Sequence, residues 1–305
     1  MDQSLGPQGL QSRVEEYAEQ ARDIARSRGY WATVLHRLLR DPVSMACALV
    51  LLTLILLAVL APWLTPYNPS QGSMLNRLAG IGTPGHWLGT DGQGRDMLTR
   101  LMYGGRYSLV MGIMPVLIAF FIGTAMGVTA GFVGGWANSL IMRTTDVFFA
   151  FPAVLLAIAI SGALGAGFVN AMVSLTLVFI PPIARVAEGV TTAVRHLDFV
   201  EAARASGAGA LTIIRVHILG NVLGPVFIYA TSLVSVCMIL AAGLSFLGLG
   251  VRPPAAEWGL MLNTLRQSLY VQPWVSVLPG AMIFLTSLCF NLLSDGLRSA
   301  MDIKR

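Results

Sequence analysis

Charged residues are scarce in this chain, and the shortage excludes an ordinary soluble domain. Only 11% of its 305 residues are Asp, Glu, Lys or Arg, whereas 55% are hydrophobic. A soluble domain carries about 25% charged residues. Lipid is therefore the expected solvent, and one helix needs roughly 20 apolar residues to cross a hydrocarbon core about 30 Å thick.

Lysine is scarcer still, because Lys304 is the only one. The chain has no GxxxxGKS/T phosphate-binding loop, so any ATP hydrolysis must belong to another chain. The net charge of +5 does not indicate nucleic acid, because the arginines stand singly between apolar runs and form no patch. They are interpreted as residues that set membrane topology.

Side chains for catalysis or metal binding are also few and dispersed. The four histidines do not cluster with carboxylates at the spacing of metal ligands. A serine protease built on Ser245 would lack a histidine base in any later span. No catalytic residue, metal site or cofactor is expected. The three cysteines lie far apart in apolar runs and are interpreted as small buried hydrophobes: Cys47, Cys237 and Cys289.

Residues 1–40 are polar and lack the early apolar core of a cleavable signal peptide. Apolar residues nevertheless recur there at helical spacing, which predicts an amphipathic helix on the cytoplasmic membrane surface; a partly ordered tail is the alternative. The recurring residues are Val14, Tyr17, Ala21, Ile24, Trp31, Leu35 and Leu38.

Long windows without charged residues locate the spans in a single domain over 41–305. The longest window contains the glycine-rich run 161–167, which divides it because glycine breaks helices. The sequence therefore predicts an all-α membrane protein with six spans. They are expected near 44–62, 108–133, 139–162, 168–190, 222–246 and 276–296.

An even number of spans puts both termini on one side of the membrane. Placing them in the cytoplasm leaves fourteen of the 20 Lys and Arg residues inside and six outside, as the positive-inside rule favours. The excess of Lys and Arg residues on the cytoplasmic side would reverse only if the 185–215 segment faced out. The outer loop, expected over 63–107, is too long for a plain connector and should have a function or a small fold of its own.

Gly123, Gly127, Gly131 and Gly135 follow each other at i+4 spacing along the second predicted span. This places them on one helix face, where small residues let another helix approach closely. Two interpretations overlap: close packing beside a transport path, and ordinary helix packing.

The segment after the fourth span predicts a short helix on the cytoplasmic side. Asp198 and Glu201 have capping-box spacing, with Asp as the cap. Gly207 suits the position just past the end of the helix. On these grounds alone, a docking element and a plain connecting helix are equally compatible.

The sequence Phe199–Ala208 resembles the EAA loop of ABC-importer permeases. The resemblance implies that the cytoplasmic loop 191–220 carries a coupling helix that inserts into an ATPase subunit. Gly220 stands where the family usually has proline, so a looser exit turn is expected there. The docking residues implied in this way are Asp198, Phe199, Glu201, Ala202, Ala203, Arg204 and Gly207.

Three more segments are similar to the dipeptide, oligopeptide and nickel branch of that family, and specifically to its second permease. They are His86–Asp96, Leu244–Gly259 and Phe290–Arg298, so the resemblance covers roughly residues 85–305. It implies a type I ABC-importer permease fold in the bacterial inner membrane. It also implies alternating access and the partners of the family: a homologous second permease, two ATP-binding subunits that use ATP and Mg, and an external substrate-binding protein.

Peptide is the substrate class that the resemblance implies, with glutathione or a nickel chelate as alternatives. A secondary transporter is a different class, and it would need ionisable residues near mid-span, which are almost absent here. A structural scaffold would not need the EAA loop.

Four charged residues of the outer loop are candidates for contact with the binding protein: Asp91, Arg95, Asp96 and Arg100. An apolar stripe beside them, starting at Met97, predicts a helix at the outer membrane interface. Packing against the outer ends of the spans is the alternative. At the cytoplasmic ends, Arg143 and Asp146 lie three apart on a helix and could pair.

Overall fold

The structure, a computed structural model, describes residues 30–301, with side chains from residue 34 onward. The regular elements in this part of the chain are helices, which confirms the all-α prediction. Five are long and apolar enough to cross a membrane, and a bent pair could make a sixth span. The five are α3 (Pro42–Leu64), α4 (Met97–Val133), α7 (Phe168–Val194), the continuous helix Ala210–Phe246 and α12 (Pro273–Met301).

The bent pair consists of α5 (Gly135–Phe149) and α6 (Ala153–Leu164), which meet at 90°. The span predicted over 139–162 is therefore not one continuous helix but a pair of helices joined by a sharp bend. Pro152 is the residue just before α6 and has no N–H to continue the helix, while it disfavours the helical backbone at the residue before it. The predicted break in the glycine run is confirmed, because α6 ends at Leu164 and Gly165 follows it with φ +86°.

The first span starts at a proline that follows a capping acid. Asp41 accepts a hydrogen bond from the Ser44 N–H at 3.0 Å, and Pro42 occupies the first turn, where its missing N–H costs nothing. Before it, α2 (Tyr30–Arg40) packs Val34 against Ala300 at the end of α12. The earlier part of the predicted amphipathic helix lies outside the described residues.

The second span starts earlier than the sequence predicts. Helix α4 begins at Met97, where Asp96 caps it by accepting from the Thr99 N–H at 2.8 Å. The outer loop therefore ends at Asp96, not at residue 107. The separate interfacial helix expected from Met97 onward is wrong, because those residues form the first turns of a continuous 37-residue helix.

Helices α4 and α7 pack through three glycines of the predicted stripe. A Cβ added at Gly123, Gly127 or Gly131 would lie 2.9, 2.2 or 2.8 Å from a backbone carbonyl oxygen of α7. Only hydrogen at these positions allows the two backbones to approach so closely.

Gly135 does not belong to this contact, so the sequence assignment is wrong there. Helix α4 ends at Val133, and Gly134 and Gly135 both have positive φ, at +70° and +54°. The chain turns at these two residues into α5, and a Cβ at Gly135 would meet nothing within 4 Å.

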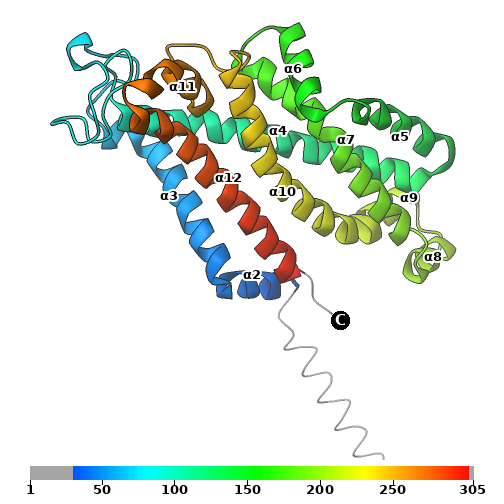
Figure 1. Cartoon of the computed structure of the whole chain (residues 1–305). Helices are drawn as coiled ribbons and strands as arrows, with labels where there is room; N and C mark the ends of the chain where they lie inside the picture. Colours follow the sequence, from blue (N-terminus) through cyan, green and yellow to red (C-terminus); the bar gives the residue numbers. More distant parts are fainter. Residues whose placement is uncertain (1–29, 302–305) are drawn as a thin grey trace, which may run out of the picture.

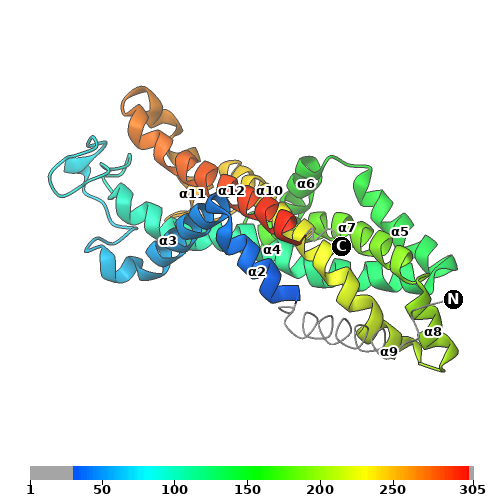
Figure 2. The same cartoon turned by 90° about the horizontal axis from the view of Figure 1, so that it is seen from below.

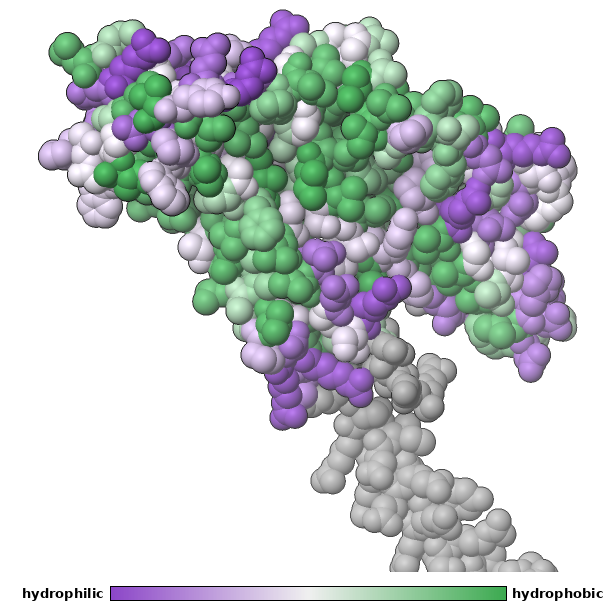
Figure 3. Space-filling view, in the orientation of Figure 1, coloured by the Kyte–Doolittle hydropathy of each residue, from purple (hydrophilic) through white to green (hydrophobic). Residues whose placement is uncertain are grey.

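The long helices place two groups of connecting segments at opposite ends of the molecule (Figure 1). One end holds the outer loop 65–96, α11 (Trp258–Leu265) and η4 (Arg266–Tyr270); the other holds α8 (Asp198–Ala205) and α9 (Ala210–Ile213). The view turned by 90° shows the same separation (Figure 2). Figure 3 shows hydrophobic residues over the middle of this face and hydrophilic residues at both ends, the pattern of a lipid-embedded belt.

Candidate functional site

Helix α8 projects from the end of the bundle opposite the outer loop (Figure 1). Val200 anchors it with a fully buried side chain, and Ala203 packs beside it against the main core. The other six residues of the helix are exposed, although Phe199 also contacts the ring of His217. Its exposed residues are Asp198, Phe199, Glu201, Ala202, Arg204 and Ala205.

The sequence predicted the end of α8 correctly but not its start. Leu197 occupies the cap position and Asp198 is the first helical residue, with no side-chain capping bond, so the predicted Asp cap is wrong. Gly207 adopts φ +83°, and its N–H donates to the Arg204 carbonyl at 3.0 Å. The Ala208 N–H donates to the Ala203 carbonyl at 3.1 Å, which completes a Schellman motif and confirms the predicted helix end.

Two cations connect the region of α8 to the end of α4. The Arg195 guanidinium donates to the Gly131 carbonyl at 2.8 Å, where a positive charge stabilises the carboxyl end of a helix. The Arg204 guanidinium lies 5.9 Å from the ring centroid of Phe132. Sequence analysis missed Arg195, because nothing in the sequence pairs it with a residue 64 positions away.

The exit from this region is a helix and not a turn. Residues Ala210–Phe246 are helical throughout, with a π-helical segment at Ile214–Ile218. Gly220 lies in the first turn of α10 (Leu219–Phe246), and a Cβ there would meet nothing within 4 Å. The looser turn expected at Gly220 is therefore wrong; the irregularity lies one turn earlier, in the π segment.

The charged pair expected on α5 also differs. Asp146 forms its ion pair with Arg185 of α7 and not with Arg143. Arg185 lies over the ring of Phe149 as well, 5.0 Å from its centroid. This pair joins the end of α5 to α7, and both of its side chains are about half exposed.

At the opposite end, Asp91 organises the outer loop. Its carboxylate accepts from the Arg95 Nε at 2.6 Å and lies 3.4 Å from the Arg100 Nε. It also accepts from the backbone N–H groups of Gln93 and Arg95. Arg100 in turn donates to the Pro69 carbonyl at 2.6 Å. Through its two arginine partners, the Asp91 carboxylate therefore holds two segments of the loop to the start of α4.

Asp96 has a similar role one turn away. Besides capping α4, it accepts from His86 Nδ1 at 3.0 Å. His86 Nε2 is 3.2 Å from the Asn76 amide nitrogen, which donates to it and so leaves the proton on Nδ1. All four charged residues expected to contact a binding protein are 2–5% exposed: Asp91, Arg95, Asp96 and Arg100. Their side chains stabilise the loop, and the exposed outer surface is formed by others, such as Leu75 and Trp87.

A buried acid joins α11 to α4. Glu257 is 1% exposed and accepts from the N–H groups of Gly259 and Leu260 at 2.9 and 2.8 Å and from the Ser108 hydroxyl at 3.0 Å. Burial raises the pKa of the Glu257 carboxyl, although these hydrogen bonds favour its charged form. The neighbouring Trp258 donates to the Leu101 carbonyl at 2.9 Å. The sequence contained Glu257 only as part of a motif and gave no sign of its burial.

Comparison with known proteins is consistent with this geometry. The family model described as "Binding-protein-dependent transport system inner membrane component" matches residues 123–303. A second model, "N-terminal TM domain of oligopeptide transport permease C", matches residues 29–80.

Individual relatives cover nearly the whole chain. The glutathione transport system permease protein GsiD of Pectobacterium atrosepticum is 42% identical over 274 residues, covering 90% of this chain and 91% of that protein. The Escherichia coli protein of the same name is 41% identical, with 90% of each chain covered. Among solved structures, the inward-facing MetNI methionine ABC transporter matches with a TM-score of 0.54 at 21% identity, covering 67% of this chain and 97% of that chain.

At that identity the MetNI likeness shows the fold alone, whereas the family match and the 42% identity extend over most of the sequence. The chain therefore belongs to the binding-protein-dependent transport system inner membrane components, as an ABC-importer permease of the oligopeptide permease C type.

Proposed function

We propose that this permease docks onto an ATP-hydrolysing subunit through the exposed face of α8. The observation that carries the proposal is the division of this short helix into an anchored face, Val200 and Ala203, and an exposed face that includes Glu201. Membership of the permease family favours docking over a plain connecting helix, because such a permease works with a separate ATP-hydrolysing subunit.

The contacts of α8 suggest how a movement of the ATPase would reach the spans. Val200 is buried in the main core, while Arg195 and Arg204 hold the end of α4. Helices α4 and α7 are packed backbone to backbone at the glycines, so a displacement of α8 would move them together. ATP and Mg would be bound by the partner subunits, and this chain would change which side of the membrane the path faces.

Docking to a cytoplasmic ATPase also fixes the proposed orientation. The end with α8 would face the cytoplasm, together with both termini. The outer loop and α11 would face outward, where a substrate-binding protein meets the permease. A homologous second permease and two ATP-binding subunits would complete the importer in the bacterial inner membrane.

Small peptides are the proposed substrate class, and glutathione is the first candidate within it. The support is the 42% identity to the GsiD permease over 90% of the chain. The alternatives, other di- or oligopeptides and nickel chelates, would be distinguished by the partner binding protein.

Two substitutions on the exposed face of α8, one that reverses a charge and one that adds bulk, test the docking surface. Glu201→Lys and Ala202→Trp both change exposed side chains of α8, so the bundle should fold while the ATPase subunits no longer co-purify and ATP-dependent uptake is lost. Ala203 is a poorer target because it packs on the core. The control is Arg143→Glu, an equally large charge reversal at an exposed position of α5, which should retain the ATPase. Retention of the ATPase and of uptake in both α8 variants would refute the proposal.

A further inference from the structure

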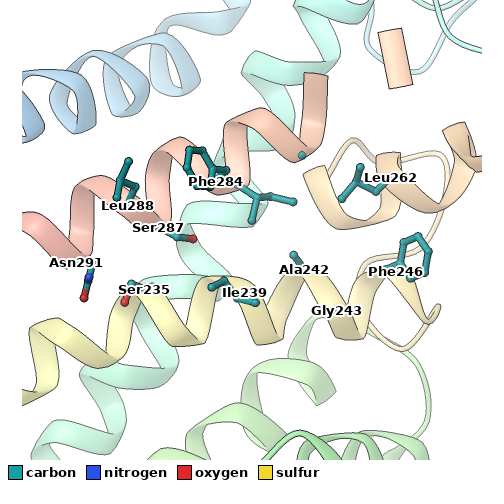
Figure 4. A pocket seen from close by; sticks show the side chains of 12 residues that line it. Ser235, Ile239, Ala242, Gly243, Phe246, Leu262, Phe284, Ser287, Leu288 and Asn291 are labelled. Atoms are coloured by element: carbon teal, nitrogen blue, oxygen red, sulfur yellow. The ribbon is translucent and has the colours of Figure 1, made fainter. Parts of the chain in front are cut away.

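One face of the α10–α12 pair is hollowed along most of its length. The outer hollow, about 680 Å³, lies between the two helices and α11, and Figure 4 shows the side chains that line it. A second hollow of about 600 Å³ follows toward the α2 end and is lined by α10, α12 and Val186 of α7. Cavities of roughly 300–1,000 Å³ are the size that small ligands occupy.

The two hollows form one groove, because their lining residues continue at helical spacing on the same face of each helix. We call it the α10–α12 groove. On α10 the lining residues run three or four apart through Tyr229, Ser232, Ser235 and Ile239. On α12 they run through Phe284, Ser287, Asn291 and Asp295.

Two polar side chains in this groove, those of Ser287 and Asn291, would be unfavourable next to lipid. The Ser287 hydroxyl is buried and has no hydrogen-bond partner within residues 30–301. Asn291 is exposed about ten residues before the end of α12, well inside the helix. In Figure 4, Ser235 and Asn291 point toward one another across the groove. An amide or hydroxyl without a partner is costly in hydrocarbon, so this face meets water or a polar molecule.

The opposite face of the same helix pair has a different character. It is lined by aromatic and aliphatic side chains such as Phe120, Phe227 and Val234. Its two hydroxyls, on Thr231 and Ser294, bond each other at 3.0 Å, and Ser294 also lines the inner hollow of the groove. That face suits lipid or a partner helix. The outer hollow of the groove is also lined mostly by apolar side chains. It differs because the Ser287 hydroxyl is buried there without a partner among the described residues and the Asn291 amide is exposed.

We propose that the α10–α12 groove is this chain's wall of the transport path, and that Ser287 and Asn291 hydrogen bond to the amide groups of a peptide-like substrate there. This proposal rests on the proposed function as an importer of small peptides. The Asn291 amide both donates and accepts, as a peptide bond does, and the Ser287 hydroxyl can do the same. Phe246 and Phe284 provide an apolar outer part, whereas the exposed Asp295 and Arg298 lie at the inner end.

Cysteine accessibility in the assembled importer tests the groove. The native cysteines are first replaced by alanine, and Ser287→Cys, Asn291→Cys and the control Phe227→Cys are then made singly. Thiolate is the reactive form and needs water, so a charged methanethiosulfonate reagent should modify the groove positions at least about tenfold faster than the control. Saturating glutathione with the binding protein should slow the reaction at 287 and 291 alone.

A second variant measures the contact itself. Asn291→Leu should raise the KM for glutathione uptake about tenfold, the effect of one lost buried hydrogen bond, while the ATPase subunits still co-purify. Asn291→Gln should restore part of the affinity.

Three results would overturn the proposal. If the groove cysteines react no faster than Phe227→Cys while ATP-dependent uptake is intact, a partner helix or lipid fills the groove and the proposed function stands. Fast reaction without protection by glutathione would give a wet groove that substrate does not use. If the native permease binds no ATPase and takes up no peptide, the proposed function is refuted as well.

Discussion

At the scale of single residues, glycine has two opposite roles on these helices. Gly127 lies where α4 meets α7, and an added Cβ would lie 2.2 Å from the Ala184 carbonyl oxygen. Gly220 lies in a helical turn with open space around it. The residue type is the same, but the distance to the neighbouring backbone differs. Adding a methyl group should therefore lower the stability of the fold at Gly127 and raise it at Gly220.

Gly127→Ala should destabilise the fold by about 1–3 kcal/mol, because the two helix backbones must move apart. Gly220→Ala should stabilise it by about 0.5–1 kcal/mol, since alanine loses less backbone freedom in a helix. Thermal unfolding of the purified importer in nanodiscs would compare the two variants with the parent. Equal shifts in the same direction would contradict the close α4–α7 contact.

At the scale of elements, α11 is held by a carboxyl group that is nearly out of reach of water. Glu257 caps the helix through two backbone N–H groups and also bonds Ser108 of α4. Helix α11 is not one of the candidate spans, so Glu257 lies outside them, and its partner Ser108 belongs to the span α4. A buried capping acid has two consequences: it positions the helix, and it makes the joint sensitive to proton binding.

Because burial raises the pKa of Glu257, the native state binds its proton more tightly than the unfolded state does. The carboxyl therefore contributes most to stability below its ordinary pKa, and that contribution is lost as pH rises through the raised value. Relative to Glu257→Gln, the parent Tm should fall as pH rises above the ordinary pKa of a glutamate carboxyl, about 4.3. If the Tm of the parent and the Tm of Glu257→Gln changed with pH in parallel, the raised pKa of Glu257 would be contradicted. Glu257→Ala also removes the cap and should be less stable, by about 1 kcal/mol, throughout the range.

At the scale of the whole molecule, two polar ends are joined by an apolar belt whose helices run from one to the other. Hydrogen bonds and ion pairs hold the outer loop, while α8 at the other end leaves six of its eight residues exposed. The groove on α10 and α12 runs between the two ends. This arrangement suits a subunit that transmits a movement from one end to the other.

Substrate class is a property of the whole importer and can be measured there. The partner binding protein should bind glutathione. Proteoliposomes in which α8 faces the lumen should accumulate labelled glutathione only when ATP is enclosed and the binding protein is outside. Unlabelled glutathione should compete, and a nickel chelate should not. Uptake of the chelate or of longer peptides in preference to glutathione would leave the family intact and exclude glutathione as the substrate.

The sequence by itself determined the features that depend on composition and short-range spacing. Scarce charge and long apolar runs gave the helical membrane fold, i+4 spacing placed Gly123, Gly127 and Gly131 on one face, and a glycine free to adopt positive φ marked the end of α8 at Gly207. These follow from the periodicity of a helix and from the absence of a side chain.

Only the tertiary structure decided which distant residues meet. It buried the Asp91 and Asp96 clusters that the sequence had placed on the surface, joined Arg195 to Gly131, bent the third span at Pro152 and brought Ser235 opposite Asn291. The burial of a charge depends on how many neighbours surround it after folding. Such neighbours come from helices far apart in the chain, and no local pattern records them.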